Sequence, residues 1–575
     1  MKPWSVLDNY RGKVFDGRWP TIPELLEITA SRFNERPCFS TFEPSRVSFR
    51  YEEVLSHVRR LAGELGSLGV RAGDRIAVSG KNSPEWAIAF LAALYAGGVV
   101  VPIDYQLQDE EIEGLIAHSG TRILFVDEER YDYFAARRER LHLLALYSLA
   151  PGKERYLLRE EATRFSGDTR PVDRDSTELA AILYTSGTTG HAKGVMLTHE
   201  NIVSDCFLSQ DLINIRERDV FYALLPIHHS YTMQAVLIEA ISCGAEIVFG
   251  KRVVVKQILA DLKQGGITIM LGIPMLYNKL LKGIMKEISA RGSVLFGVVT
   301  GLMAVCGFAK HQLNLNLGRF VFGSILRQAS LDKVRVCICG GGPLPAETVL
   351  RFNQLGLDFV QGYGLTETSP IVALNPVEHY KESSVGKIIS EVEVRIESPD
   401  DLGIGEILVR GPIVMKGYFE NPEATASSFA PGGYLKTGDV GYVDSENYLY
   451  LTGRQKNMIV TEGGKNVFPE EIEDLFQLYD EVEQVLVRGY LKDATMKIED
   501  IEALIFPSQD ALRELAAAEG RAPDRTFAEE RVAKIIAEVN QKLLRYKKIG
   551  RYRIISEPLP MTTTRKIKRF KVSGA

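Results

Sequence analysis

A stretch rich in glycine and hydroxyl side chains, Tyr184 to Val195, carries the strongest chemical signal in the chain. It reads YTSGTTGHAKGV and combines three glycines, several hydroxyl side chains and one lysine. Glycine lets backbone N–H groups turn toward a ligand, hydroxyl groups donate to phosphate oxygens, and lysine supplies a compact cation. The composition predicts a phosphate-binding loop with contacts from Thr185, Ser186, Gly187, Thr188, Thr189, Gly190 and Lys193.

The flanks of this loop separate it from the Walker loop of P-loop enzymes. In a Walker loop a Gly-Lys-Ser/Thr ends the motif, whereas here Lys193 stands between Ala192 and Gly194. The apolar runs AAILYT and VMLT on either side predict the order strand, loop, strand. A flexible surface hairpin is the plain alternative, but it would not require a lysine between two buried strands.

Two further stretches place glycines at the end of an apolar strand. They are ICGGGPLP, which contains Gly341 and Gly342, and DFVQGYGLTETSP, which contains Gln361 to Gly364 followed by Thr366 and Glu367. Strand ends of this kind are where α/β folds leave the backbone accessible to a ligand. A helix cap at Thr366 is the structural alternative for the second stretch.

These stretches, with LPIHHSY, TGD and TGR, resemble the adenylate-forming superfamily of acyl-CoA and aryl-CoA ligases, luciferases and peptide-synthetase adenylation domains. The resemblance covers most of the chain and is greatest for long-chain fatty acid–CoA ligases. It implies that ATP binds with its adenine against Gly341, Gly342 and Tyr363, within a segment that also supplies Gln361, Gly362 and Gly364.

The same resemblance assigns polar roles around the nucleotide. Asp439 and Arg454 would contact the ribose, and Thr366 would donate to the α-phosphate. Glu367 would hold Mg²⁺ together with Thr185, in keeping with the preference of this ion for oxygen ligands. His229 would lie by the acyl carboxylate, with His228 where many relatives carry an aromatic residue.

The end of the chain resembles the terminal motif of the superfamily. In LPMTTTRKIKRF the motif lysine aligns with Lys566, and Arg565 stands where relatives usually have glycine. The resemblance makes Lys566 a catalytic residue in the first half-reaction, which forms acyl-AMP. It gives catalytic roles to Lys193, Thr366 and His229 as well. Gly463 and Gly464 would then let the pantetheine arm of coenzyme A pass.

Length and pattern predict the domain organisation. At 575 residues the chain exceeds what one hydrophobic core usually serves. Alternating helical and strand patterns predict a large N-terminal domain of layered α/β subdomains with a β-rich portion, at 1–453. By resemblance, a hinge at 454–457 centred on Lys456 leads to a small mobile α+β domain at 458–575. The charged segment from Glu128 to Arg174 is expected to be a surface connection.

Composition restricts partners and compartment. The chain is 45% hydrophobic and 25% charged with a net charge of −5, which gives no general attraction to nucleic acid. Six scattered cysteines favour reduced thiols in the cytoplasm over a disulfide framework. The first residues lack the apolar core of a signal peptide.

An uncharged segment from Ser293 to Ala309 allows three interpretations. It reads SVLFGVVTGLMAVCGFA and lies between Arg291 and Lys310. It is short for a membrane span. A helix over the acyl pocket, a helix in peripheral contact with a membrane, and plain core all remain open. A homo-oligomer is also left open.

The resemblance implies an enzyme that joins a fatty acid, with a long chain favoured, to coenzyme A through an acyl-AMP intermediate, using ATP and Mg²⁺. Three alternatives remain. The first is transfer of the acyl group to the phosphopantetheine of a carrier protein, and the second is an aryl-CoA ligase. The third is a nucleotide sensor without catalytic activity.

Overall fold

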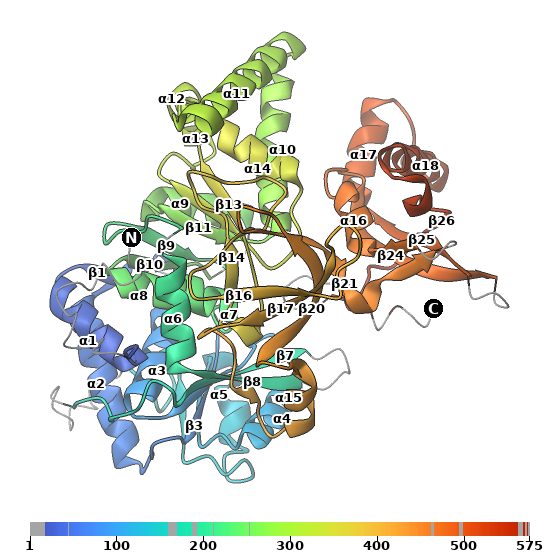
Figure 1. The fold of residues 1–575 in the computed structure, drawn as a ribbon. Coiled ribbons are helices and arrows are strands. Elements are labelled where there is room, and N and C mark those ends of the chain that lie inside the picture. The colour runs from blue at the N-terminus through green and yellow to red at the C-terminus, as the bar shows by residue number, and fades with distance from the viewer. Residues whose placement is uncertain are drawn as a thin grey trace.

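The computed structural model describes residues 18–43, 45–158, 169–186, 192–210, 212–251, 254–461, 465–493, 498–561, 567–569 and 572. Over these residues the strands form three sheets, and helices cover their faces (Figure 1). This confirms the expected α/β class, with a β-rich portion in the N-terminal part.

A sheet of seven strands occupies the lower part of Figure 1, in the order β18-β8-β7-β4-β3-β5-β6. The strands are β3 (Arg75–Ser79), β4 (Val99–Pro102), β5 (Ile123–Val126), β6 (Ala145–Ser148), β7 (Leu179–Ser186), β8 (Ala192–Thr198) and β18 (Gly417–Tyr418). The accompanying helices are α2 (Tyr51–Ser67), α3 (Pro84–Tyr95), α4 (Asp109–Ser119), α5 (Glu128–Ala135) and α15 (Pro422–Ser428).

A second sheet of fourteen strands is parallel in one half and antiparallel in the other. Its order is β16-β17-β20-β21-β15-β14-β13-β12-β11-β9-β10-β1-β2, with β19 paired to β20. The half that contains β1 (Pro37–Thr41), β10 (Glu246–Phe249), β9 (Val220–Ala223), β11 (Ile269–Gly272), β12 (Val336–Cys339) and β13 (Asp358–Gly364) is parallel. β2 (Val47–Arg50) adds an antiparallel edge to it.

The other half begins on β13 itself. Residues 358–361 of β13 pair in parallel with β12, and residues 362–364 pair antiparallel with β14. One strand therefore joins the two halves. The antiparallel strands are β14 (Ile371–Leu374), β15 (Gly386–Ile388), β16 (Glu393–Glu397), β17 (Gly405–Arg410), β19 (Phe429–Ala430), β20 (Tyr434–Val443) and β21 (Tyr448–Arg454).

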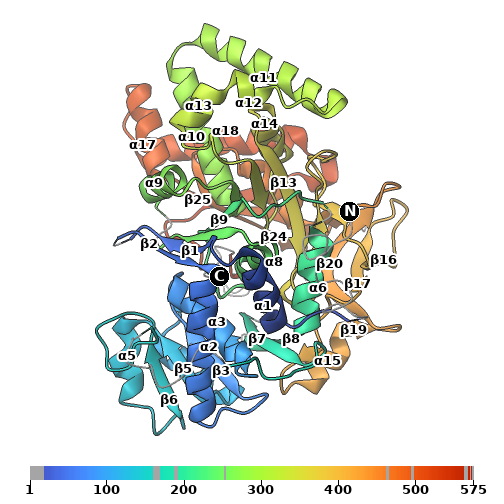
Figure 2. The same cartoon turned by 90° about the vertical axis from the view of Figure 1, so that its left-hand side faces the viewer.

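Helices on this sheet include a group that stands at the top of Figures 1 and 2. That group consists of α10 (Pro274–Ala290), α11 (Ser293–Leu313), α12 (Gly318–Val321), α13 (Gly323–Gln328) and α14 (Ala346–Gln354). The remaining helices are α1 (Ile22–Phe33), α6 (His199–Ser209), α7 (Ser230–Thr232), α8 (Glu239–Cys243) and α9 (Val255–Gly265), with a π-helical segment at Met233–Ile238 between α7 and α8.

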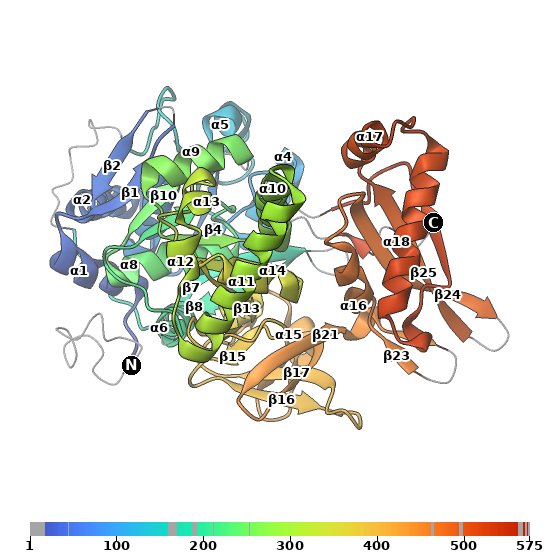
Figure 3. The same ribbon diagram turned by 90° about the horizontal axis from the view of Figure 1, so that it is seen from above.

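The third sheet is built entirely from strands that follow Asn457. It contains β22 (Ile459–Thr461), β23 (Lys465–Val467), β24 (Val482–Asp493), β25 (Ile498–Pro507) and β26 (Arg551–Ile554), with helices α16 (Pro469–Glu473), α17 (Gln509–Ala518) and α18 (Arg525–Lys542). Figure 3 shows this region standing apart from the rest of the molecule. Its core is also its own, formed by residues such as Ile501, Ile505 and Val532.

Helix α3 illustrates how sequence sets local structure here. Ser83 caps it by accepting from the Trp86 amide, and Pro84 occupies the first turn, where no intrahelical N–H bond is needed. Every residue from Trp86 to Tyr95 is buried, so the helix lies inside the protein. Gly97 then adopts φ +78° and turns the chain into β4.

The expectation of a surface connection from Glu128 to Arg174 is wrong for its first part. That part forms α5 and the strand β6, whose four residues are all buried. The apolar run in β6 is short and follows an arginine-rich helix end, so its burial against β5 is set by strand pairing and not by local composition.

The C-terminal region contacts the rest of the protein through α10. Asn278 Nδ2 donates to Gln477 Oε1 at 2.9 Å, Lys282 pairs with Asp480 at 2.7 Å, and Lys286 pairs with Glu514 at 2.6 Å. The last pair is exposed to solvent on both sides, so it contributes little to stability. These contacts accompany the orientation that Figure 3 displays.

Candidate nucleotide-binding and catalytic site

The glycine- and hydroxyl-rich stretch is the turn of a β-hairpin. Strands β7 and β8 are antiparallel, with Thr185 opposite Lys193 and Tyr184 opposite Gly194. This confirms the predicted order of strand, loop and strand. Gly187, Thr188, Thr189 and Gly190 lie outside the described residues, and of Ser186 only the backbone in β7 is described.

A tyrosine connects this hairpin to the predicted metal carboxylate. Tyr418 lies in β18, which pairs with β8, and the Lys193 Nζ lies 4.8 Å from the centroid of its ring. The Tyr418 hydroxyl donates to Glu367 Oε1 at 2.9 Å. Burial, followed by the charge of Glu367, raises the pKa of Tyr418, so the phenol keeps its proton. Lys193 and Glu367 therefore both contact the side chain of Tyr418.

Sequence reasoning did not assign Tyr418. The signal available was its place in MKGYFENP, an aromatic residue after Gly417, but its partner Glu367 lies 51 positions earlier in the chain. Only the pairing of β18 with β8 brings it to the hairpin.

One residue separates the end of β13 from the short 3₁₀ turn, Thr366–Thr368, that contains Thr366 and Glu367. Leu365 and not Thr366 is the N-cap of this turn, which removes the helix-cap explanation for Thr366. The Thr366 hydroxyl lies 3.1 Å from the Ser230 hydroxyl, so the turn at the end of β13 meets the turn that carries the two histidines.

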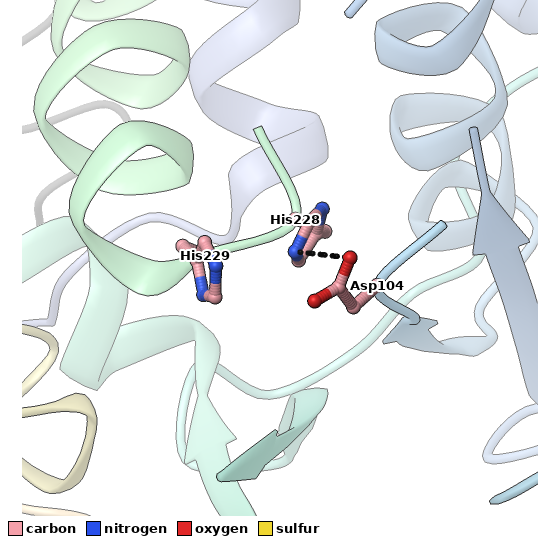
Figure 4. Close-up of side chains that lie close together, drawn as sticks. All are labelled: Asp104, His228 and His229. Atoms are coloured by element: carbon pink, nitrogen blue, oxygen red, sulfur yellow. Dashed lines mark ion pairs between the residues drawn. The ribbon is translucent and has the colours of Figure 1, made fainter. Parts of the chain in front are cut away.

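His228 and His229 lie against Asp104, which follows β4 (Figure 4). His228 Nε2 is 3.4 Å from Asp104 Oδ1, and the two imidazole rings lie 4.2 Å apart between centroids. His228 is buried, whereas His229 is partly exposed. Asp104 and His228 thus pack beside His229, the residue that the resemblance places by the acyl carboxylate.

The three side chains in Figure 4 also offer ligand atoms within 4.8 Å of one another. Two imidazoles and one carboxylate suit a transition metal better than Mg²⁺, which prefers oxygen ligands. This group is therefore not the site that the resemblance implies for Mg²⁺, which stays a prediction at Glu367 and Thr185.

The predicted adenine and ribose residues are in direct contact. Tyr363 donates from its hydroxyl to Asp439 Oδ2 at 2.7 Å, and Arg454 Nε lies 2.9 Å from Asp439 Oδ1. Asp439 and Arg454 are opposite each other in β20 and β21. Burial and the charge of Asp439 raise the pKa of Tyr363. Since each carboxylate oxygen can accept more than one hydrogen bond, Asp439 retains acceptor capacity.

The glycines of this region meet different local demands. Gly364 is required by packing, because a Cβ at this position would lie 1.5 Å from the Pro370 carbonyl oxygen. Gly341 adopts φ +82°, which favours glycine, and the nearest atom to a Cβ there is 3.8 Å away, at Ile273. Gln361 is buried, and Gly362 packs against Leu374.

The hinge residue Lys456 lies in a short 3₁₀ turn at Gln455–Asn457. Burial lowers its pKa, and the charge of Arg454 lowers it further. The charge of Arg569, three residues beyond Lys566, acts in the same direction, and Arg569 pairs with Glu473 at 2.5 Å. Gly463, Gly464 and Lys566 lie outside the described residues.

The chain is similar to known proteins over most of its length. The family described as AMP-binding enzyme matches residues 26–419. A feruloyl-CoA synthase from an Amycolatopsis species is 31% identical over 452 residues, covering 76% of this chain and 80% of that protein. The long-chain-fatty-acid–CoA ligase FadD15 of Mycobacterium bovis is 31% identical over 464 residues, covering 76% and 75% respectively.

Other relatives cover more of this chain. The long-chain-fatty-acid–[acyl-carrier-protein] ligase AEE15 of Arabidopsis thaliana is 25% identical over 96% of this chain and 87% of its own length. Among solved structures, ATP-bound MatB from Rhodopseudomonas palustris superposes with a TM-score of 0.74 at 25% identity, covering 100% of this chain and 98% of that one.

The fold and the converging strand ends define an adenylate-forming enzyme. The chain belongs to the AMP-binding enzyme family, since the family match spans more than half of its length. The resemblance drawn from the motifs is confirmed, and its relatives include long-chain fatty acid–CoA ligases.

Proposed function

We propose that the protein is an ATP-dependent ligase that activates a carboxylic acid as acyl-AMP and transfers the acyl group to coenzyme A. One observation carries this proposal. β13 and the turn after it hold Tyr363, Thr366 and Glu367 within five positions, and each contacts a different long-range partner: Asp439, Ser230 and Tyr418. Groups suited to base, ribose, phosphate and metal therefore meet along one strand end.

A carboxylate must be activated before a thiol can attack it, because its negative charge repels the nucleophile and oxide is a poor leaving group. In the first half-reaction a carboxylate oxygen of the acid attacks the α-phosphorus of ATP and pyrophosphate leaves. Lys193 and Lys566 would offset the growing negative charge, and Thr366 would donate to the α-phosphate. His229 would orient the acid.

Magnesium fits the residues at this strand end. Glu367 supplies a carboxylate, and Thr185 in the neighbouring hairpin supplies a hydroxyl, so both are oxygen donors. When bound, the ion would neutralise phosphate charge. Tyr418 would orient the Glu367 carboxylate.

In the second half-reaction the thiolate of coenzyme A attacks the acyl carbonyl carbon, and AMP leaves with the electron pair of the broken acyl–phosphate bond. One set of groups cannot surround both a departing pyrophosphate and an entering thiol. Rotation of residues 458–575 about the hinge at 454–457 would remove Lys566 and bring Gly463 and Gly464 to the site. Residues 1–453 would stay fixed.

We further propose a long-chain fatty acid as the substrate and the cytoplasm as the compartment. The uncharged insertion and the similarity to fatty acid–CoA ligases support the first, although a feruloyl-CoA synthase is equally similar in identity. All six cysteines are buried and free, which supports a reducing compartment.

A panel of acids tests the substrate proposal. Pyrophosphate release is measured with acetate, octanoate, oleate, benzoate and ferulate, with and without coenzyme A. Fastest release with oleate supports the long-chain assignment, and fastest release with ferulate or benzoate makes the enzyme an aryl-CoA ligase. No release with any acid would favour a nucleotide sensor.

Transfer to a carrier protein is the second candidate, because a carrier-protein ligase aligns over 96% of this chain. Supplying purified acyl-AMP with either coenzyme A or phosphopantetheinylated carrier protein separates the two acceptors. Thioester formed only on the carrier protein would replace the coenzyme A proposal.

The variant Lys566→Ala tests the division of the two half-reactions. We expect loss of acyl-AMP formation, because the cation near the α-phosphate is gone, while thioester formation from supplied acyl-AMP persists. Arg565→Ala serves as the neighbouring control and should retain both. Equal loss of both half-reactions in Lys566→Ala would reject the assigned role.

A further inference from the structure

Helices α11 and α12 lie at one end of the molecule (Figures 1 and 2). They expose many large apolar side chains. Val294 is 81% exposed, Phe308 67% and Phe320 93%. We call this the α11–α12 surface, and it consists of Val294, Leu295, Val298, Leu302, Val305, Phe308, Phe320 and Val321. Plain core, one interpretation of the uncharged segment, is therefore wrong.

The exposure follows the helical repeat. Val294, Val298, Leu302, Val305 and Phe308 succeed one another at steps of four or three residues, which places them on one face of α11. Contiguous apolar patches of this kind on a protein surface mark sites of interaction with proteins, ligands or membranes.

The opposite face of α11 is fixed to the protein. Val299, Met303 and Cys306 are buried in the core beneath. Gly307 permits close approach to α14, because a Cβ there would lie 2.8 Å from the Gln354 side chain. The surface is thus displayed on a rigidly held helix.

Buried Lys310 completes this attachment. Its Nζ donates to Asp358 Oδ1 at 2.7 Å, to Asn353 Oδ1 at 2.7 Å and to the Leu357 carbonyl oxygen at 3.1 Å. In the described part of the chain, α11 is the one helix long and apolar enough to cross a membrane. Crossing would break the Lys310 contacts, so an orientation parallel to a membrane surface fits better.

The segment that carries this surface has charge of one sign. From Ile288 to Leu331 the sequence contains no aspartate or glutamate, and its charged residues are Arg291, Lys310, Arg319 and Arg327. Lys310 pairs with Asp358 and Arg291 with Glu287, and Arg319 donates to backbone carbonyl oxygens. Arg327 is exposed. A second copy packed symmetrically on this surface would bring the same basic residues together. An anionic lipid bilayer, which has negative charge over an apolar interior, complements the α11–α12 surface better.

We propose that the α11–α12 surface docks the protein on anionic phospholipid bilayers, with α11 lying in the plane of the interface. Phe308 and Phe320 enter the acyl boundary, and Arg327 meets lipid phosphates. Docking depends on this surface alone. Its use, which is to receive an acid that partitions into membranes, rests on the proposed function.

Vesicle sedimentation without substrates tests the docking. The protein is mixed with vesicles of phosphatidylcholine alone or of equal parts phosphatidylcholine and phosphatidylglycerol. We expect binding to the anionic vesicles that weakens with added salt. Phe308→Glu and Phe320→Glu should each reduce the partition coefficient by about tenfold or more, because each removes an aromatic side chain that would enter the acyl boundary of the bilayer. Arg327→Gln should reduce the preference for anionic vesicles.

Leu402→Glu is the matched control. Leu402 is 78% exposed in the turn between β16 and β17, so the change in charge and polarity is similar but lies elsewhere. It should bind vesicles like the wild type. All these residues are exposed, so the thermal midpoint and the activity on a short soluble acid should be retained.

Three outcomes would overturn the proposal. The first is no binding of wild type to anionic vesicles. The second is equal binding by wild type, Phe308→Glu and Phe320→Glu. The third is a dimer in solution that Phe320→Glu converts to monomer without vesicle binding by either protein, which would make the surface a contact between copies. Because no substrate is present, these results are independent of ligase activity.

Discussion

The link between Lys193, Tyr418 and Glu367 makes a sharp prediction for Tyr418→Phe. This substitution deletes only the hydroxyl that donates to Glu367 Oε1 at 2.9 Å, and it keeps the ring that lies under Lys193. Tyr418 is 9% exposed, so water does not readily replace the lost donor. Any effect on Mg²⁺ binding then reports the orientation of Glu367.

The size of the effect follows from the kind of bond removed. A hydrogen bond to a charged group is worth about 1.5–3 kcal/mol, and loss of a partner that orients a metal ligand typically costs about 10–100-fold in metal affinity. We therefore expect the half-saturating Mg²⁺ concentration to rise about 10–100-fold. The fold itself should persist, because a loss of about 1–3 kcal/mol leaves most domains folded.

The assay measures initial pyrophosphate release at saturating ATP and acid while Mg²⁺ is varied. Tyr434→Phe is the control, since its hydroxyl also donates to a glutamate, Glu393 Oε2 at 2.7 Å, but at an exposed position on the outer strands. It should leave Mg²⁺ saturation unchanged. Wild-type Mg²⁺ dependence in Tyr418→Phe, or an equal shift in Tyr434→Phe, would refute the reasoning.

Two further predictions concern stability. Burial raises the pKa of Glu239 to about 8 from 4.5, so between these values the folded protein keeps a proton that the unfolded chain releases, and stability falls as pH rises by up to about 1.4 kcal/mol per pH unit. Glu239→Gln lacks this titration. The thermal midpoint of the variant minus that of the wild type should therefore increase from pH 5 to pH 8. A difference that stays constant with pH would contradict the assignment. Lys310→Met should destabilise by about 1.5–3 kcal/mol or more in thermal unfolding, because it removes a buried cation that donates to Asn353 and to the partly exposed Asp358. Lys286→Met, which removes an exposed pair with Glu514, should cost less than about 1 kcal/mol, and equal losses would show that Lys310 is not the anchor of α11.

Much of the fold was readable from local pattern. The strands on either side of the glycine-rich loop, the cap at Thr198 and the glycine turn after α3 are all set by residues within a few positions. Short-range steric and hydrogen-bonding preferences decide such features. Strand β6 was not predicted, because a short and largely apolar run in a charged segment becomes a strand only when β5 is beside it.

The sequence by itself determined which chemistry the chain carries: a phosphate loop with one lysine, glycine-ended strands, and carboxylates in motifs that resemble the adenylate-forming enzymes. Only the tertiary structure decided which of these groups touch. The contacts from Tyr363 to Asp439 and from Tyr418 to Glu367 span 76 and 51 positions. The first depends on β13 joining two halves of one sheet, and the second also needs β18 to pair with β8 in another sheet.

Tertiary structure also decided which side chains of the uncharged segment are buried and which are exposed. Composition gives the total apolar content of α11 but not which face the core covers, because that depends on the helices packed beneath it. The protein buries Met303 and leaves Phe308 67% exposed on the same helix. Partition between core and surface is a property of packing, which local sequence alone does not specify.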